Sequence, residues 1–117
     1  LNNSVQVLTD VANRIINAKR VDVYGIYKSG IVAKDFCYQL IQLGIPASYY
    51  EDMLLSSVSA ATTDKDSIVF AISETGITRD IISAVEYAKK NDAYVIVLTR
   101  NKFSKLAEIA DGLKGEK

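Results

Sequence analysis

A chain of 117 residues, 49% of them hydrophobic and 24% charged, has the composition of one globular domain and not that of a disordered or fibrous protein. Its 14 Lys and Arg residues balance its 14 Asp and Glu residues, so no net field exists to hold nucleic acid or an anionic membrane directly. No apolar run approaches the roughly 20 residues of a membrane span and no leader peptide is recognisable, which predicts a cytoplasmic protein without a membrane partner.

Helices and strands are predicted to alternate along the chain. Apolar residues recur at helical spacing from Val5 to Ala18, which indicates an amphipathic helix leading into the domain. The predicted elements that follow are a strand at Val21–Tyr24, a helix at Ile31–Leu43, a strand at Ala47–Tyr50, a helix at Asp52–Ala61, a strand at Ser67–Ile72, a helix at Thr78–Lys90, a strand at Ala93–Leu98 and a short helix at Ser104–Ala110.

This alternation, with nearly continuous apolar strands, predicts a parallel sheet covered by helices on both faces. We expect a doubly wound, flavodoxin-like α/β fold of four to five strands in the order 2-1-3-4-5, arranged in three α-β-α layers. The chain starts at Leu1 and ends in a polar stretch, 111–117, without a further apolar strand. We therefore expect a piece of a longer protein, with a connecting helix in residues 1–20 and a domain in residues 21–117 whose C-terminal strand is incomplete.

The turn Gly25–Gly30 leaves the first strand and enters a helix. Backbone N–H groups at a helix start have partial positive charge and attract anions. Ser29 can add a hydroxyl donor there and Lys28 a cation. The same residues also fit a tight turn that glycine permits, with Ser29 as the helix cap.

The stretch Ser73–Thr78 leaves the third strand and opens another helix. Its hydroxyls and Gly76 supply short donors and free backbone N–H groups with no bulky side chain between them, as a phosphate requires. An ordinary polar loop with a Thr cap is the alternative. Because the first and third strands are neighbours in the order 2-1-3-4-5, one anion can contact both loops.

A wider pattern surrounds these loops: the strand that ends at Gly25, the serine that opens the helix, Ser73–Thr78, Ala88–Lys90, the strand Ala93–Leu98, Thr99, and Ser104–Ala107 before Ala110–Asp111. From about Val21 to Asp111 this pattern resembles the sugar isomerase (SIS) domain family. It is most similar to the effector domains of RpiR-type transcriptional regulators.

The resemblance implies a domain that binds the phosphate of a phosphorylated sugar. It also implies a homodimer or higher homo-oligomer with ligand sites near the subunit interface, and contact with DNA only through a helix-turn-helix domain absent from this chain. The hydroxyls of Ser29, Ser73, Thr75 and Thr78 are implied as phosphate ligands, with Gly76 allowing close approach. The full set of predicted binding residues is Lys28, Ser29, Ser73, Glu74, Thr75, Gly76 and Thr78.

Three positions differ from the family pattern. Tyr27 stands where the turn commonly has a second glycine, and Thr75 replaces a usual serine but keeps its hydroxyl. Glu74 places a carboxylate beside the predicted anion. That charge opposes a dianionic phosphate unless the side chain turns outward or accepts hydrogen bonds from sugar hydroxyls.

An aldose-ketose isomerase of the same family is one alternative function. Isomerisation needs a positioned base and a positioned acid, and one of them is usually a histidine. This chain has no histidine. Glu51, Asp52 and Glu74 are the candidate bases, and we assign no catalytic residue.

A nucleotide-binding Rossmann domain is the second alternative. Gly25 and Gly30 keep the outer glycines of its fingerprint and Glu51 follows the second strand, but Tyr27 replaces the central glycine that lets a pyrophosphate approach. With no histidine and one cysteine, Cys37, which we place in the core, neither a metal site nor a cofactor is predicted.

Overall fold

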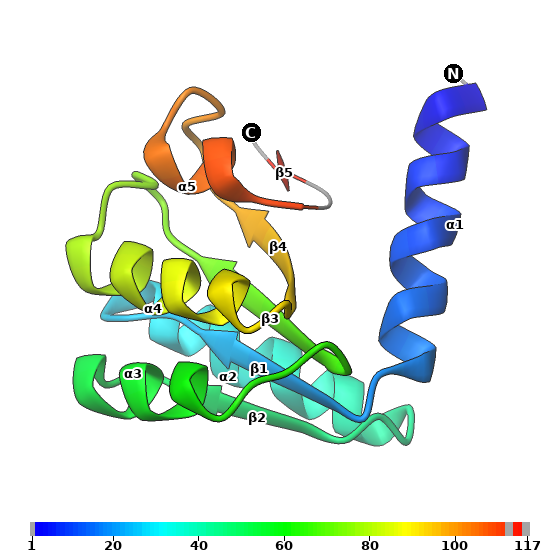
Figure 1. Cartoon of the computed structure of the whole chain (residues 1–117), viewed down its shortest axis with the longest axis horizontal. Coiled ribbons are helices and arrows are strands. Elements are labelled where there is room, and N and C mark those ends of the chain that lie inside the picture. The colour runs from blue at the N-terminus through cyan, green and yellow to red at the C-terminus, as the bar shows by residue number, and fades with distance from the viewer. Residues whose placement is uncertain (1, 112–113, 116–117) are drawn as a thin grey trace.

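The computed structural model describes residues 2–111 and 114–115 (Figure 1). Helices and strands alternate as the sequence predicts. In chain order they are α1 (Asn2–Asn17), β1 (Arg20–Tyr24), α2 (Lys28–Gln42), β2 (Ala47–Tyr50), α3 (Met53–Ala61), β3 (Ser67–Ile72), α4 (Arg79–Lys90), β4 (Tyr94–Leu98), α5 (Lys105–Ile109) and β5 (Lys114–Gly115).

The strands form one sheet in the order β2-β1-β3-β4-β5, with every neighbouring pair parallel, so the predicted α/β fold and strand order are confirmed. The register places Val23 of β1 opposite Tyr49 of β2 and Phe70 of β3. The two-residue β5 lies in the stretch for which no apolar strand was predicted. Parallel pairing brings the carboxyl ends of β1 and β3 to the same edge, side by side.

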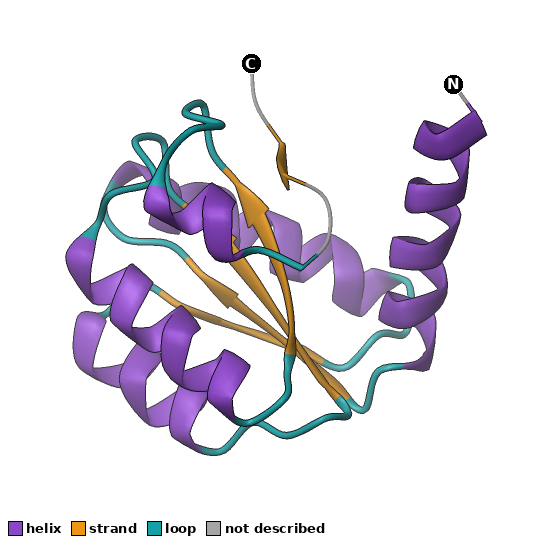
Figure 2. Cartoon of the chain, turned by 45° about the horizontal axis from the view of Figure 1, so that its top comes forward, coloured by secondary structure: helices purple, strands orange, loops and turns teal. Residues whose placement is uncertain are grey.

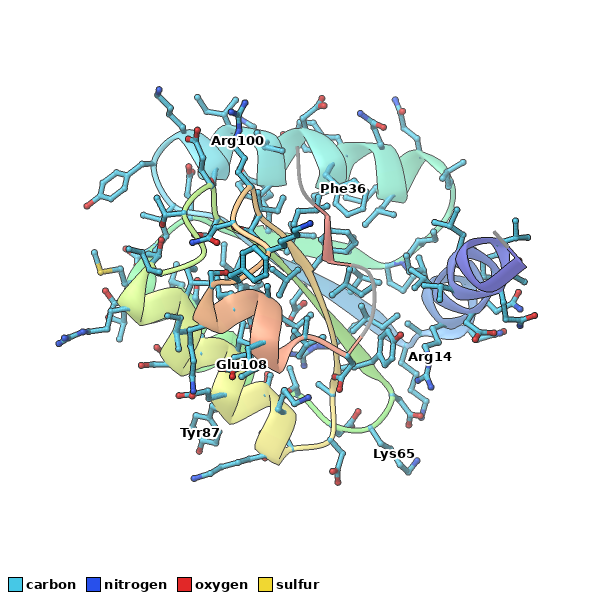
Figure 3. The ribbon with its side chains drawn as sticks, turned by 90° about the horizontal axis from the view of Figure 1, so that it is seen from above. Arg14, Phe36, Lys65, Tyr87, Arg100 and Glu108 are labelled. Atoms are coloured by element: carbon cyan, nitrogen blue, oxygen red, sulfur yellow. The ribbon has the colours of Figure 1, made fainter. Side chains whose placement is uncertain are left out.

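Helices cover both faces of the sheet (Figure 2). On one face, Val21, Val23 and Phe70 pack against α2. Phe36 points from α2 to the sheet (Figure 3), with its ring centroid 4.6 Å from that of Phe70. Cys37 lies in the same cluster and is 1% exposed, which confirms its predicted place in the core. Burial raises the pKa of its thiol.

The opposite face is covered by α3, α4 and α5 (Figure 2). Val69 and Val95 of the sheet, Val85 of α4 and Leu106 of α5 are all fully buried there. Burying such a side chain stabilises the fold by about 1.5–3 kcal/mol. The fold is therefore held by two apolar layers, one on each side of the strands.

A buried polar network lies between β1 and α3. The Asp22 carboxylate, 3% exposed, accepts hydrogen bonds from Arg20 (Nη2, 2.7 Å) and Ser59 (Oγ, 2.6 Å). The Ser59 hydroxyl also lies 2.7 Å from the Tyr24 hydroxyl, and Arg20 donates to the carbonyls of Ser59 and Thr62. Among the residues with described side chains, no buried polar atom lacks a hydrogen-bond partner, so these groups compensate one another's desolvation.

The two predicted helix starts nearest the site differ from the structure. Helix α2 begins at Lys28, three residues before the predicted Ile31, and its N-cap is Tyr27. Ser29 therefore lies in the first turn of α2, and the alternative in which Ser29 caps this helix is wrong. Helix α4 begins at Arg79, with Thr78 as its N-cap.

Candidate functional site

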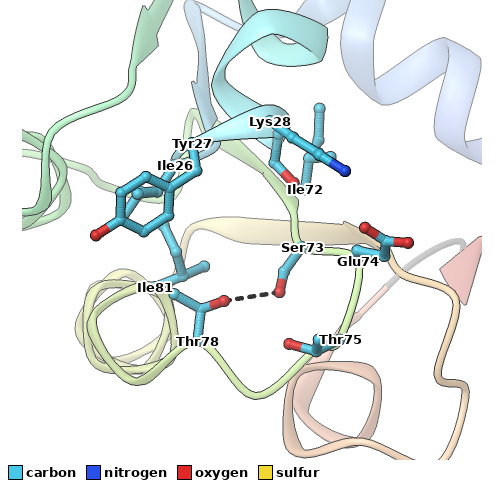
Figure 4. A pocket seen from close by; sticks show the side chains of 10 residues that line it. Ile26, Tyr27, Lys28, Ile72, Ser73, Glu74, Thr75, Thr78 and Ile81 are labelled. Atoms are coloured by element: carbon cyan, nitrogen blue, oxygen red, sulfur yellow. Dashed lines mark hydrogen bonds between the residues drawn. The ribbon is translucent and has the colours of Figure 1, made fainter.

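The two polar loops meet in one pocket at the carboxyl ends of β1 and β3 (Figure 4). Its volume is about 300 Å³. Of the predicted binding residues, all but Gly76 line it. The lining residues are Ile26, Tyr27, Lys28, Ser29, Ile72, Ser73, Glu74, Thr75, Thr78 and Ile81. The predicted convergence of the loops is therefore present in the fold.

Ser73 and Thr78 link the end of β3 to the start of α4. Their hydroxyl oxygens lie 3.0 Å apart (Figure 4), and the Ser73 oxygen also accepts the backbone N–H of Gly76 at 3.0 Å. The Gly76 N–H is therefore already used within the loop. The two hydroxyls share one hydrogen bond, so one of their two protons stays available for a ligand.

Gly76 has a φ of 73°, a left-handed conformation that favours glycine. A Cβ at this position would collide with the hydroxyl of Ser104 and lie 2.9 Å from that of Thr99. The absence of a Cβ at Gly76 thus lets this loop pack closely against the segment that follows β4. This segment also supports the loop, because Thr99 donates to the Glu74 carbonyl and the Leu106 N–H donates to the Gly76 carbonyl.

Glu74 turns away from the two hydroxyls. Its carboxylate points away from Ser73 and Thr78 (Figure 4) and lies 3.6 Å from the Arg100 guanidinium. Both side chains are more than half exposed, so this ion pair contributes little stability, on the order of 0–1 kcal/mol. The pairing nevertheless offsets the negative charge that the sequence places beside the predicted anion.

Arg100, Thr99 and Ser104 are not among the predicted site residues. All three follow β4, which neighbours β3 in the sheet. The predicted strand order contains the signal that would have found them, because it brings the end of β4 beside the end of β3.

The two helices that open onto the pocket lack a capping side chain. Asp52 caps α3 by accepting the N–H groups of Leu54 and Leu55, and Ser104 caps α5. By contrast, neither Tyr27 at α2 nor Thr78 at α4 makes a side-chain cap hydrogen bond. At α2 the N–H groups of Ser29 and Gly30 donate to the backbone carbonyls of Ile26 and Tyr27. The positive end of each helix dipole still faces the pocket without a capping side chain, which favours an anion at this position.

Tyr27 has an unusual backbone conformation, with φ 60° and ψ −125°. A residue with a Cβ in such a sparsely populated region costs on the order of 1–3 kcal/mol. Its side chain is 80% exposed, so little burial offsets this strain. The strained residue stands at the rim of the pocket.

Two of the candidate isomerase bases, Glu51 and Asp52, lie outside the pocket lining. The Asp52 carboxylate accepts the Leu54 N–H at 2.7 Å as a helix cap. Glu51 lies next to Gly30, where a Cβ would be 3.0 Å from its Cβ and Oε1. Neither residue lines the pocket.

A larger hollow of about 700 Å³ is lined by Ser83, Glu86, Tyr87 and Lys90. All four side chains come from α4, and Tyr87 lies on its outer side (Figure 3). No strand end or second loop contributes to it, so the pocket between the polar loops is the better candidate. Within the described residues, no helix has both the length and the apolar character to cross a membrane.

Comparison with known proteins identifies the family. The model of the SIS domain matches residues 14–112. The chain belongs to the SIS domain family. This finding confirms the predicted family and agrees with the sheet topology.

Relatives of this SIS domain include helix-turn-helix (HTH) regulators. An uncharacterised HTH-type transcriptional regulator of Caldanaerobacter subterraneus subsp. tengcongensis is 36% identical over 108 residues, which are 92% of this chain and 38% of the relative. The HTH-type transcriptional regulator RpiR of Escherichia coli strain K12 is 29% identical over 92% of this chain and 36% of its own length. The chain thus spans well under half of these curated relatives.

A solved structure has the same fold at high similarity. The Vibrio vulnificus NanR protein complexed with ManNAc-6P superposes with a TM-score of 0.89 at 29% identity. The superposition covers 96% of this chain and 43% of the NanR chain.

Proposed function

We propose that this SIS domain binds a phosphorylated sugar as the effector domain of a transcriptional regulator. The observation on which the proposal rests is the pocket where the uncapped starts of α2 and α4 meet. An anion with several oxygens can accept hydrogen bonds from both helix starts and from the Ser73 and Thr78 hydroxyls. The HTH-type relatives and the similar NanR structure with ManNAc-6P support the assignment.

The phosphate is proposed to lie over Ser29, Ser73, Thr75 and Thr78, with Lys28 as the nearby cation. Ser73 is 3% exposed and hydrogen-bonded to Thr78 and Gly76, so its proposed contribution is a hydrogen-bonding position at the pocket floor. Glu74 is proposed to contact sugar hydroxyls and not the phosphate, since its carboxylate points away from the hydroxyl pair.

The proposal assigns residues 1–20 to a connecting helix and 21–117 to the binding domain. Helix α1 buries Val11 against the α2 side of the core but leaves Val5, Leu8 and Ile16 more than half exposed. Contact with DNA is proposed to come from a helix-turn-helix domain outside these residues, and the site of action is the cytoplasm, where bacterial regulators meet DNA. Binding would change regulation only if the two arrangements of the protein differ in ligand affinity.

A homodimer is also proposed. Helix α3 exposes four large apolar side chains, and an exposed apolar surface of this kind is typical of a protein contact. They are Met53 (43%), Leu54 (71%), Leu55 (51%) and Val58 (53%). The proposal predicts a dimer by sedimentation of the wild-type chain and a shift to monomer in the L54E variant.

The function is tested by thermal shift and calorimetry with a panel of sugar phosphates, NAD and inorganic phosphate. Stabilisation by at least one sugar phosphate, with no aldose-ketose conversion of it, supports an effector domain. Stabilisation by NAD alone supports the Rossmann alternative, and turnover of a sugar phosphate supports the isomerase alternative. Either of these two results rejects the proposal.

A further inference from the structure

Tyr27 is the one lining residue of the pocket whose backbone has a positive φ. At φ 60° and ψ −125° the backbone takes a conformation normally left to glycine. Replacement by glycine would relieve the strain, yet this position holds a tyrosine. A strained residue persists where its surroundings or its role require it.

Folding contacts do not explain the tyrosine. The ring is 80% exposed, and among the described side chains its hydroxyl makes no hydrogen bond and its ring no aromatic or cation contact. Within residues 2–111 and 114–115, the other non-glycine residue with positive φ is Asp92 (φ 69°), and aspartate tolerates that region better because its short side chain forms local hydrogen bonds. At Tyr27, therefore, no packing or hydrogen bond of the side chain compensates for the backbone strain.

The pocket has a polar side and an apolar side. Ser73 and Thr78 form the polar floor, while Ile26, Ile72 and Ile81 are at least nine-tenths buried around it and add apolar lining. Figure 4 shows the Tyr27 ring on the α4 side of the pocket and the Lys28 side chain on the opposite side. A bare phosphate gains nothing from apolar lining, whereas the carbon skeleton of a sugar does.

We propose that Tyr27 determines specificity for the sugar portion of the ligand: its ring packs against the carbon face of a cyclic sugar phosphate whose phosphate lies over Ser73 and Thr78. This inference rests on the proposed function and adds the class of ligand, a sugar in its ring form. The ring stands at the α4 side of the pocket in Figure 4, and Lys28 on the opposite side is proposed to contact the charged end of the ligand.

Three variants distinguish the effect of the Tyr27 ring from the effect of its backbone strain. Y27F keeps both the ring and the Cβ, Y27A keeps the Cβ and removes the ring, and Y27G removes both. D92G relieves the other positive φ, at the end of α4, and is the matched control. Circular dichroism and thermal melting check the fold of each variant.

Calorimetry of the 117-residue chain with ManNAc-6P, glucose 6-phosphate and inorganic phosphate tests the proposal. For a sugar phosphate that the wild type binds, Y27A and Y27G weaken affinity about five- to twentyfold, as expected for lost apolar and aromatic contact, and leave that for inorganic phosphate within twofold. Y27F and D92G leave both affinities within twofold. Y27G raises the Tm by a few degrees, about 2–6 °C, while Y27A does not.

Four results overturn the inference and can be told apart. Unchanged sugar phosphate affinity in Y27A and Y27G removes the ring's role but leaves the proposed function intact. Equal weakening of sugar phosphate and inorganic phosphate assigns Tyr27 to the anion site. A wild-type chain that binds none of the three probes overturns both the inference and the proposed function, and a loss of dimer in Y27A without a change in affinity makes the ring a subunit contact.

Discussion

The hydroxyl oxygens of Ser73 and Thr78 lie 3.0 Å apart. This contact joins the residue that follows β3 to the N-cap residue of α4. This bond takes the Thr78 hydroxyl away from the α4 amides that a cap residue usually satisfies. The helix start therefore stays open towards the pocket that it shares with the start of α2. One short contact thus produces both a fixed hydroxyl pair and an uncapped helix.

Replacing both hydroxyls tests this arrangement. The S73A/T78A double variant is expected to weaken sugar phosphate binding severalfold or more, by about 1–3 kcal/mol, because charge-assisted hydrogen bonds are lost. Calorimetry measures the change. S57A is the control, since Ser57 is exposed on α3 and bonds only the Met53 carbonyl. Equal affinities in wild type and double variant would contradict the assignment.

Gly76 and Gly44 provide a matched pair. Both have positive φ, 73° and 83°, but a Cβ meets Ser104 at Gly76 and nothing within 4 Å at Gly44. We expect G44A to lower the free energy of unfolding by about 1–2 kcal/mol through strain alone. G76A adds the cost of overpacking, for a total of about 2–5 kcal/mol, measured by urea unfolding. Equal losses in the two variants would mean that the loop and α5 separate freely.

The Asp22 network predicts a large stability effect away from the pocket. D22A removes the carboxylate that accepts from the buried Ser59 hydroxyl and from Arg20, and it leaves the half-buried Arg20 charge with only neutral acceptors such as the Thr62 carbonyl. We expect a loss of about 2–4 kcal/mol in the free energy of unfolding, less than for a fully buried pair because Arg20 reaches solvent. D35A, which removes an exposed carboxylate bonded only to Gln39, should cost under about 0.5 kcal/mol. A D22A variant as stable as D35A would exclude a structural role for the network.

Tyr24 predicts a dependence of stability on alkaline pH. Burial raises the pKa of its phenol, and the hydrogen bond between Tyr24 and Ser59 opposes this rise only in part. The folded chain thus keeps the proton at pH values where the unfolded chain, with an ordinary pKa of about 10, releases it. The contribution to stability is full below about pH 10 and is lost as the pH rises through the raised value, at up to about 1.4 kcal/mol per pH unit.

The measurement for Tyr24 is the free energy of unfolding between about pH 8 and 11.5. The wild type should lose more stability over this range than Y24F, which cannot titrate at that position. Y38F, at an exposed tyrosine, should follow the wild type. Parallel curves for wild type and Y24F would contradict the predicted shift.

Much of the fold can be predicted from local patterns. The bounds of β2 and β3 match the structure at both ends, because each is a short run of strand-forming residues between turn signals. The start of α2 is missed by three residues, since Gly30 disfavours a helix and the apolar period begins only at Ile31. A Cβ at Gly30 would lie 3.0 Å from Glu51 and from the Gly25 carbonyl, so this position in the first turn of α2 favours glycine.

The candidate site can be predicted only where the residue types within a single loop already indicate anion binding. The hydroxyls and glycine of Ser73–Thr78 do so, and the strand order brings them to the first loop. The pairing of Glu74 with Arg100 depends on contacts between residues distant in sequence, and so does the burial of Asp22 against Ser59. The strain at Tyr27 is a backbone angle, which no residue pattern reports.

We propose that one phosphate contacts the starts of α2 and α4 at the same time. Backbone amide NMR during titration with a sugar phosphate that binds is the most direct test of this proposal. We expect the amide signals of residues 28–31 and of residues 76–81 to shift together, with the same dissociation constant, while the signals from the opposite ends of the strands do not move. Shifts confined to one of the two segments, or none in either, would contradict it.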